Sequence, residues 1–430
     1  MNKGTKIYNL AKELFPIHRH LTGKGVNLTL EKIKNIIPDL KIHKIPSGTK
    51  CFDWKVPKEW SIKEGYIADL NGRKIIDIKE NNLHVVQYSR SVSKIINIED
   101  LKKKLYFLKN DPDAIPYVTS YYAPDWGFCL SYNQLSSLKD KKYKVHIKSF
   151  KFNGHMSIGE LLIRGKSKKE IFLSTYICHP SLANNEISGP SLLSYLARYI
   201  SGFKNKTYSY RIIFIPETIG SIYYLSENLS KMKDNVILGM NISCVGDDGP
   251  YSYVSSRKGD TYADKIIKKF ISTKSNYINY GYLKHRGSDE RQYCMPKIDL
   301  PLITFSRSKF GKYKEYHTSQ DNMNFISPSG FEGSYNFLKN IIDYCEKNEV
   351  YLNNVFVEPF MTKLNLGNTL SSIKNTKTIN IKYKKSKIIR DILILLDGTN
   401  DIKDVMKNLK INSSELNKYI SFLLSKKLIR

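Results

Sequence analysis

The chain has 430 residues, 41% of them hydrophobic, a composition that excludes an intrinsically disordered protein and allows roughly two or three packed domains. Its formal charge of +29, from 69 basic and 40 acidic side chains, ordinarily indicates a polyanionic partner. The lysines are spread along the whole chain among many Asn, Ile and Tyr residues, so we expect a polyanion only as a secondary partner. A small acidic substrate would be steered by the same field.

No apolar run approaches roughly 18 residues, and no apolar stretch of signal length follows the polar N-terminus, MNKGTK. We therefore expect neither a membrane span nor export, and we expect a cytoplasmic protein. The six cysteines show no Cys-x-x-Cys spacing, which argues against a disulfide scaffold and against a zinc knuckle.

Residues 1–45 carry two amphipathic helix patterns and are expected to begin the main domain. Short β-rich runs follow at 66–70, 74–78 and 83–86, with Asn-Gly between the first two. Asn-Gly between strand-like runs is typical of a hairpin. We predict a small, mainly antiparallel inserted domain at residues 46–140. Its candidate core or cleft-lining aromatic residues are Trp54, Trp60, Tyr122 and Trp126.

Strand and helix patterns alternate from residue 141 to about 365. Apolar, β-rich runs occur at 171–177, 210–215, 236–243 and 301–305, and helix patterns follow the first two. Alternation of this kind predicts an α/β core whose mostly parallel sheet is covered by helices on both faces. Residues 1–45 and 141–365 are therefore expected to form the catalytic core.

Polar side chains follow the ends of these strands. His179, Glu217 and Asp247 come after the first three strands, and His317 lies in the loop after the fourth. In open α/β sheets such groups converge beyond the carboxyl ends of the strands. Each residue could instead have a purely structural role. A histidine could be held by hydrogen bonds, Glu217 could cap the helix that follows it, and Asp247 could form a turn. Together they predict a metal-dependent hydrolase, because its site needs imidazoles, carboxylates and a base.

The pattern of the C-terminal part of the chain predicts a separate helical unit. A stretch at 369–378, rich in Ser, Asn, Thr and Lys, is typical of a surface linker. Three helix patterns follow at 386–396, 401–409 and 413–424. We predict a compact three-helix domain at residues 378–430.

Long stretches after the core strands carry a family resemblance: CHPSLANNE at 178–186, PETIGS at 216–221, RGSDERQYC at 286–294 and YHTS at 316–319. Shorter ones, PIHR at 16–19, PSGT at 46–49 and FDW at 52–54, extend it to the N-terminus. The chain resembles bacterial zinc aminopeptidase-like proteins that have a small inserted β-rich domain and a C-terminal winged helix. Members of that group are often associated with surface-polysaccharide biosynthesis.

The resemblance implies roles for three residues of this chain. His179 matches the first ligand histidine of zinc aminopeptidases, Glu217 their general base, and His317 their late ligand histidine. Three further ligand positions differ. The bridging Asp falls near Asn185, a ligand Glu falls on Thr218, and the Asp of the third strand falls near Ser243.

These neutral replacements decide the expected number of metal ions. An amide and hydroxyls cannot balance two divalent cations in a poorly solvated cleft. We predict one ion per chain, most plausibly zinc, held by His179 and His317. A carboxylate from Glu186 or Asp247 would complete the ligand set. Glu217 would take a proton from water and return it to the leaving amine.

A second polar group is expected near the cleft, in the stretch at 286–294. Arg291 can pair with a substrate carboxylate, and Tyr293 can donate to a developing oxyanion. The other expected substrate-binding residues are Asp289, Glu290 and Tyr316. The alternative interpretation is a buried structural ion-pair network.

Two other function classes stay open. The chain could be a hydrolase relative that binds a sugar or peptide without cleaving it, which the neutral residues Asn185 and Thr218 would favour. It could also act through its winged helix, in docking, in homo-oligomer formation, or on DNA, although that helix offers no arginine row. The inserted domain is a second candidate oligomer contact. The amide substrate itself is open between a peptide and a glycan-linked group, and we expect no membrane partner.

Overall fold

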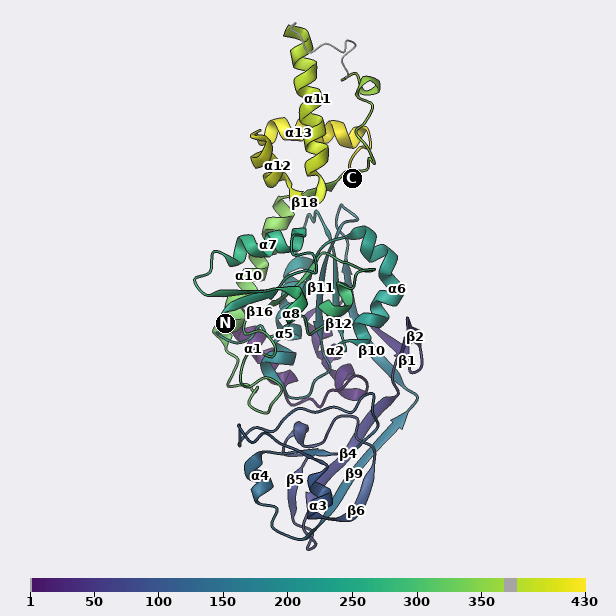
Figure 1. The fold of residues 1–430 in the computed structure, drawn as a ribbon, viewed down its shortest axis with the longest axis vertical. Coiled ribbons are helices and arrows are strands. Elements are labelled where there is room, and N and C mark those ends of the chain that lie inside the picture. The colour runs from purple at the N-terminus through teal and green to yellow at the C-terminus, as the bar shows by residue number, and fades with distance from the viewer. Residues whose placement is uncertain (1, 367–376) are drawn as a thin grey trace.

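The computed structural model describes residues 2–366 and 377–430, without the side chains of 377–383, and contains a central eight-stranded sheet (Figure 1). In spatial order the strands are β1 (Lys41–Pro46), β10 (His155–Ile163), β12 (Ser209–Ile215), β11 (Glu170–Tyr176), β13 (Val236–Ile242), β16 (Leu302–Ser306), β14 (Tyr251–Val254) and β15 (Tyr277–Tyr280). The four strands β12, β11, β13 and β16 run parallel to one another. Antiparallel pairing joins β1 and β10 on one side and β14 on the other.

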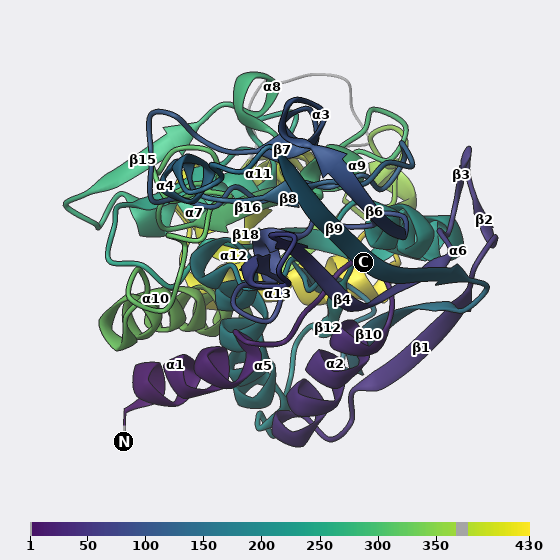
Figure 2. The same ribbon diagram turned by 90° about the horizontal axis from the view of Figure 1, so that it is seen from below.

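Both faces of this sheet are buried. In β11, Ile171 and Leu173 belong to one apolar cluster and Phe172 belongs to the other, because successive side chains of a strand point to opposite faces. The first cluster is completed by α1 (Lys3–Leu14), α2 (Lys24–Ile36), α5 (Ser188–Ser201), α7 (Tyr262–Ile271) and α10 (Pro328–Lys347). The second is completed by α6 (Ile219–Asn235) and α9 (Glu290–Tyr293). Figure 2 shows α1, α2, α5 and α10 grouped on one side. The predicted α/β class with a mostly parallel sheet is confirmed.

A four-stranded antiparallel sheet forms the inserted unit, in the order β5-β4-β9-β6. Its strands are β4 (Glu59–Ala68), β5 (Lys74–Asp77), β6 (Val92–Asn97) and β9 (Lys142–Phe152). The expected Asn-Gly turn joins β4 to β5, with Gly72 at a φ of 91° that favours glycine. The short elements of this region are β2 (Lys50–Cys51), β3 (Trp54–Lys55), β7 (Leu105–Tyr106), β8 (Phe128–Cys129), α3 (Ile98–Lys102) and α4 (Tyr132–Ser136).

Two details of the inserted unit differ from the sequence expectation. The run at 83–86 is no strand: a 3-10 turn occupies Asn82–His84, and the Asn81 side chain accepts a hydrogen bond from the backbone N–H of Leu83. The return to the core comes later than residue 141. The whole of β9 pairs with β4 and β6, and only β10 joins the central sheet.

The C-terminal unit contains α11 (Lys377–Leu395), β18 (Asp397–Asp401), α12 (Ile402–Leu409) and α13 (Ser413–Ser425). Its β18 pairs with β17 (Val350–Leu352), which directly follows the core helix α10. The three helices lie close to the predicted positions, but α11 begins before residue 386 and includes 377–378 of the predicted linker. Residues 369–376 of that linker lie outside the described residues. The winged-helix assignment stays a prediction.

The inserted unit and the C-terminal unit lie at opposite ends of the core (Figure 1). The other short elements are α8 (Tyr282–His285), a 3-10 turn at Met361–Leu364 and a π-helical turn at Ala183–Ile187. None of the helices in the described parts of the chain is long and apolar enough to span a lipid bilayer.

Candidate metal centre

The structure brings three of the predicted residues together beyond the carboxyl ends of the central strands. His179 follows β11, Glu217 follows β12, and His317 lies between β16 and α10. The rings of His179 and His317 have centroids 5.5 Å apart. The Nε2 atom of His179 lies 3.7 Å from Oε2 of Glu217. Strand ends therefore assemble two imidazoles and one carboxylate around a common space.

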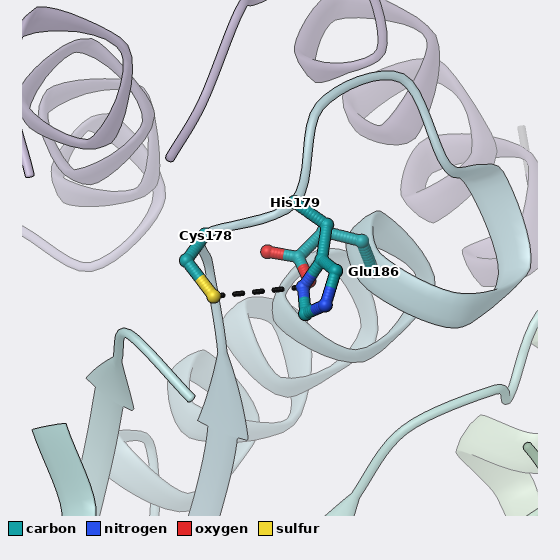
Figure 3. A group of neighbouring side chains, drawn as sticks. All are labelled: Cys178, His179 and Glu186. Carbon is teal, nitrogen blue, oxygen red and sulfur yellow. Dashed lines mark hydrogen bonds and ion pairs between the residues drawn. The ribbon is translucent and has the colours of Figure 1, made fainter. Parts of the chain in front are cut away.

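Glu186 contacts the other nitrogen of His179. Its Oε2 lies 2.6 Å from His179 Nδ1, and Figure 3 shows the two side chains together with Cys178. Glu186 is carried by the π-helical turn Ala183–Ile187, a rare local geometry that often marks functional sites. A carboxylate at Nδ1 fixes the orientation of the ring and directs Nε2 toward Glu217. Glu186 therefore orients the His179 ring from its Nδ1 side and does not lie in the space beside Nε2.

Cys178 lies on the same side as Glu186. Its Sγ is 3.5 Å from His179 Nδ1 and accepts a hydrogen bond from the backbone N–H of Glu217 over 3.2 Å. Cys178, His179 and Glu186 are the one cluster of three possible metal-ligating side chains found among the described residues. Burial raises the pKa of the Cys178 thiol to about 11, and its Sγ is already engaged by the backbone N–H of Glu217.

A buried arginine that sequence reasoning gave no role completes this side. Arg19 is fully buried, and its Nε donates to the carbonyl oxygen of His179 over 3.0 Å. Its Nη2 has no hydrogen-bond partner in the described part of the chain. Burial lowers the pKa of Arg19 to about 10, and the negative charge of Glu186 acts in the opposite direction. Arg19 thus holds the backbone of His179 and places a cation in the field of Glu186.

Glu217 has the environment of a general base. Its side chain is 22% exposed, and its Oε1 accepts a hydrogen bond from the Ser288 hydroxyl over 2.8 Å. Burial raises the pKa of Glu217, while the His179 charge and the Ser288 hydrogen bond lower it again, and the net direction is upward. A carboxylate with a raised pKa is a better proton acceptor near neutral pH than an ordinary one.

The next residue, Thr218, is held in a strained backbone conformation. Its φ is 67°, which is rare for a β-branched residue, and its N–H donates to Asp289 Oδ1 over 2.7 Å. Arg291 donates from Nη2 to the Thr218 hydroxyl over 3.2 Å and from Nε to the carbonyl of Ser288. Arg291 is therefore fixed beside the loop that follows Glu217, and its pairing with a substrate carboxylate stays a prediction.

Three of the other predicted residues form a buried network beneath this loop. Asp289 accepts from Thr218 and from the Ser221 hydroxyl, and burial with the Glu217 charge raises its pKa to about 8. Glu290 accepts from two backbone N–H groups and from Thr304. Tyr293 is fully buried and shares a hydrogen bond with Ser174. The three side chains hold the loop and do not line the space at Glu217.

Asp247 is not brought to the histidines. Its oxygens accept hydrogen bonds from Asn184 Nδ2, from the Ser308 hydroxyl and from the backbone N–H of Gly249. These contacts fix the turn after β13 and the π-helical turn, which is the structural interpretation weighed for Asp247. The positions implied for a second metal ion carry neutral side chains that are engaged elsewhere, because Asn185 donates to the Tyr176 hydroxyl and the Thr218 hydroxyl accepts from Arg291.

Two tyrosines enclose the imidazoles. Tyr316 stacks on His317 with centroids 3.9 Å apart, so it positions that ring. Tyr117 comes from the inserted unit, and its ring lies 5.0 Å from His179 and 5.1 Å from His317. The sequence analysis missed Tyr117. The available signal was the aromatic stretch that ends in Tyr121 and Tyr122.

Together the parallel sheet and the strand-end site define an α/β protein with an aminopeptidase-like fold. The chain is similar to the zinc aminopeptidase BSAP from Bacillus subtilis, with 14% identity, a TM-score of 0.58, and coverage of 80% of this chain and 94% of that one. At that identity the likeness shows the fold alone. The chain belongs to the family described as "Domain of unknown function (DUF4910)", which matches residues 8–348.

Two closer relatives come from Clostridium acetobutylicum. One, provisionally named a polysaccharide biosynthesis protein with an aminopeptidase-like domain, is 44% identical over 361 residues, which cover 84% of this chain and 82% of the relative. The other is the crystal structure of a provisionally named peptidase. It shares 39% identity and a TM-score of 0.79, and the match covers 99% of this chain and 96% of that one.

Proposed function

We propose that this protein is a metal-dependent hydrolase that cleaves an amide bond with one zinc ion per chain. The observation that carries the proposal is the pairing of His179 Nδ1 with Glu186, which leaves Nε2 beside Glu217, with the His317 ring 5.5 Å from the His179 ring. The ring nitrogens of His317 have no hydrogen-bond partner among the described residues, so this imidazole is also available. His179 and His317 supply imidazole donors of the kind that catalytic zinc sites use, and Glu217 is the neighbouring base and not a ligand.

His179 and His317 would hold the ion from the protein side, with Glu186 as a positioning residue and not as a ligand. When bound, zinc supplies a Lewis acid that polarises a carbonyl oxygen and makes water more acidic. The sequence prediction had a carboxylate from Glu186 or Asp247 as the third ligand, and this assignment uses neither, because Glu186 pairs with His179 Nδ1 and Asp247 with Asn184 and Ser308. Because the protein supplies few donors on the Nε2 side, the ion should exchange more readily than in a closed structural site.

Glu217 would accept the proton of the attacking water at Oε2, since Oε1 is occupied by the Ser288 hydroxyl. The same carboxyl group then returns the proton to the leaving amine. Arg291 would orient an anionic group of the substrate through the part of its guanidinium that is not bound to Thr218 and Ser288. The Tyr117 phenol, whose pKa is raised by burial, stays neutral and is a hydrogen-bond donor beside both imidazoles.

The substrate proposal comes from the C. acetobutylicum relative, whose provisional name refers to polysaccharide biosynthesis. We propose an amide that links an acyl or aminoacyl group to a sugar. The field of a chain with a formal charge of +29 would favour acidic members of that class. The three-helix C-terminal unit is proposed as a winged helix that serves in docking or in homo-oligomer contact.

A second candidate is a sugar- or peptide-binding protein that has lost the reaction. Asn185 and Thr218 favour it, because both stand where zinc aminopeptidases have acidic ligands. The two functions predict different turnover. A binder would hold an N-acylated sugar without releasing the free amine, whereas the hydrolase releases it in proportion to the metal content.

Zinc content measured by elemental mass spectrometry tests the proposal. We expect about one zinc per chain in the wild type and in His155→Ala, a control at an exposed histidine, and a large loss in His179→Ala and in His317→Ala. Glu217→Gln should keep the metal and lose turnover of N-acylated hexosamines and amino acid anilides. No metal after zinc addition, or full turnover in Glu217→Gln, would refute the proposal.

A further inference from the structure

A continuous row of aromatic side chains leads from the surface to His179. Trp54 packs edge-on against Tyr122 with centroids 5.3 Å apart, and Tyr122 lies 6.3 Å from Tyr121. The Tyr121 hydroxyl is 2.8 Å from the hydroxyl of Tyr117, whose ring contacts His179. The row therefore begins at an exposed end, where Tyr122 is 61% exposed, and ends at the candidate metal centre.

The exposed end of the row carries backbone strain. Trp54 belongs to the hairpin of β2 and β3, whose loop residue Phe52 has a φ of 54° and is 57% exposed. A positive φ is rare for a bulky residue, and glycine is the usual choice there. Such strain is retained mostly where a site requires it. The hairpin rests on α6, the helix that begins directly after Glu217 and Thr218.

Charged groups adjoin this aromatic surface. Burial raises the pKa of the Tyr122 phenol to about 12, and the charges of Arg291 and Glu217 act on it in opposite directions, so this phenol lies within the field of both groups. Asp53 lies between Phe52 and Trp54 in the hairpin loop. Flat aromatic faces with carboxylate and guanidinium groups at their edge suit a sugar ring, which has C–H faces and hydroxyl edges. An apolar peptide side chain would use the faces and leave the charged groups unpaired.

We infer that Trp54 and Tyr122 form a carbohydrate-stacking subsite that holds the sugar ring of the substrate while its amide reaches Glu217. This inference rests on the proposed function and specifies its substrate: a pyranose sugar with an acyl or aminoacyl amide. The sugar ring stacks at the hairpin, and Tyr121 and Tyr117 continue the row of aromatic side chains to His179. Trp54 and Tyr122 are thus specificity-determining residues and take no part in the proton transfer.

Equilibrium binding in the Glu217→Gln background tests the subsite without turnover. The probes are the methyl glycosides of an N-acetylated hexosamine and of a hexuronic acid, and the comparison ligand is phenylalanine amide. We expect Trp54→Ala and Tyr122→Ala to weaken binding of at least one glycoside by about tenfold, the scale of one lost aromatic contact. Tyr122→Phe should retain the affinity, because it keeps the ring.

Tyr132 provides a matched control, since it is a partly exposed tyrosine that packs against Phe107 elsewhere in the inserted unit. Tyr132→Ala should leave glycoside binding unchanged. Unchanged affinity in Trp54→Ala, no binding of either glycoside to the parent, or a selective loss of phenylalanine amide would each overturn the inference. A tenfold loss of glycoside binding in a protein that cleaves no amide would retain the subsite and reject only the hydrolase.

Discussion

The backbone N–H of Tyr117 donates a hydrogen bond to the carbonyl oxygen of His317 over 2.8 Å. Two further hydrogen bonds extend this junction: the backbone N–H of Ser319 donates to the carbonyl oxygen of Ile115, and the backbone N–H of Ile115 donates to the Ser319 hydroxyl. A segment of the inserted unit is therefore fixed to the loop that carries a candidate ligand. The inserted unit therefore contributes Tyr117 to the candidate metal centre and is not an independent domain.

Tyr117→Ala should lower kcat/KM by about fivefold, because it removes the ring that packs on both imidazoles, a contact worth about 1 kcal/mol. Tyr117→Phe keeps the ring, so its kcat/KM should decrease less than that of Tyr117→Ala. The measurement is steady-state kinetics on an N-acylated sugar, with zinc content determined in parallel. Equal activity in the alanine variant and the wild type would show that the inserted unit contributes nothing at this position.

Glu186→Gln should weaken zinc binding by about 10- to 100-fold, which is the usual cost of losing an outer carboxylate behind a ligand histidine. The side-chain shape is kept, so the fold should be unaffected. Competition with a chromophoric chelator gives the affinity. A loss as complete as that of His179→Ala would instead make Glu186 a direct ligand, and an unchanged affinity would remove it from the site.

Ser288→Ala should shift the acid limb of the pH profile. The hydrogen bond from Ser288 lowers the pKa of Glu217, whose net value is already raised by burial. Loss of this bond raises the pKa further, so the base becomes protonated at a higher pH and kcat/KM declines earlier on acidification. A profile of kcat/KM between pH 4 and pH 9 for both proteins would reveal the shift. A shift toward lower pH would contradict the assignment of Glu217 as the base.

Asp289→Asn should flatten the pH dependence of stability in chelator-treated protein. Burial and the Glu217 charge raise the folded-state pKa of Asp289 from 3.8 to about 8, so the folded chain keeps a proton that the unfolded chain has released. The stability that Asp289 contributes is therefore largest below about pH 4 and is lost as pH rises toward about 8.

Asparagine can still accept from Thr218 and Ser221 through its amide oxygen. The variant should thus gain stability relative to the wild type at pH 8 and show little difference near pH 4. Urea unfolding at the two pH values measures this. If the difference between the proteins were the same at both, Asp289 would not be protonated in the folded state.

The sequence predicted the central strands because apolar, β-branched runs of strand length have few other folded states. It also predicted the convergence of His179, Glu217 and His317, since parallel strands end at one edge of the sheet. It could not predict the direction of a side chain after the strand. Asp247 and Tyr293 are the right residue types near the right place, but hydrogen bonds to Asn184 and Ser174 direct them elsewhere.

Contacts between distant segments were beyond sequence reasoning for a different reason. Tyr117 is about 60 residues from His179 in the chain, and only the docking of the inserted unit brings the rings together. The run at 83–86 resembles a strand by composition. Neighbouring loops bury it, however, and it forms a 3-10 turn in place of a hydrogen-bonded β-ladder. The start of α11 within a polar stretch shows that composition alone does not mark the end of a linker.

The π-helical turn that carries Glu186 behaves as one extra residue inserted before α5. Deleting a single residue from Ala183–Ile187 would let the segment wind as an ordinary α-helix, and the residues before it would rotate by roughly 100° about the helix axis. Glu186 would then move away from His179. Asn184 and Asn185 would also lose their present hydrogen bonds to Asp247 and Tyr176. A relative with a one-residue gap at this turn should therefore show altered metal binding even if it retained both histidines.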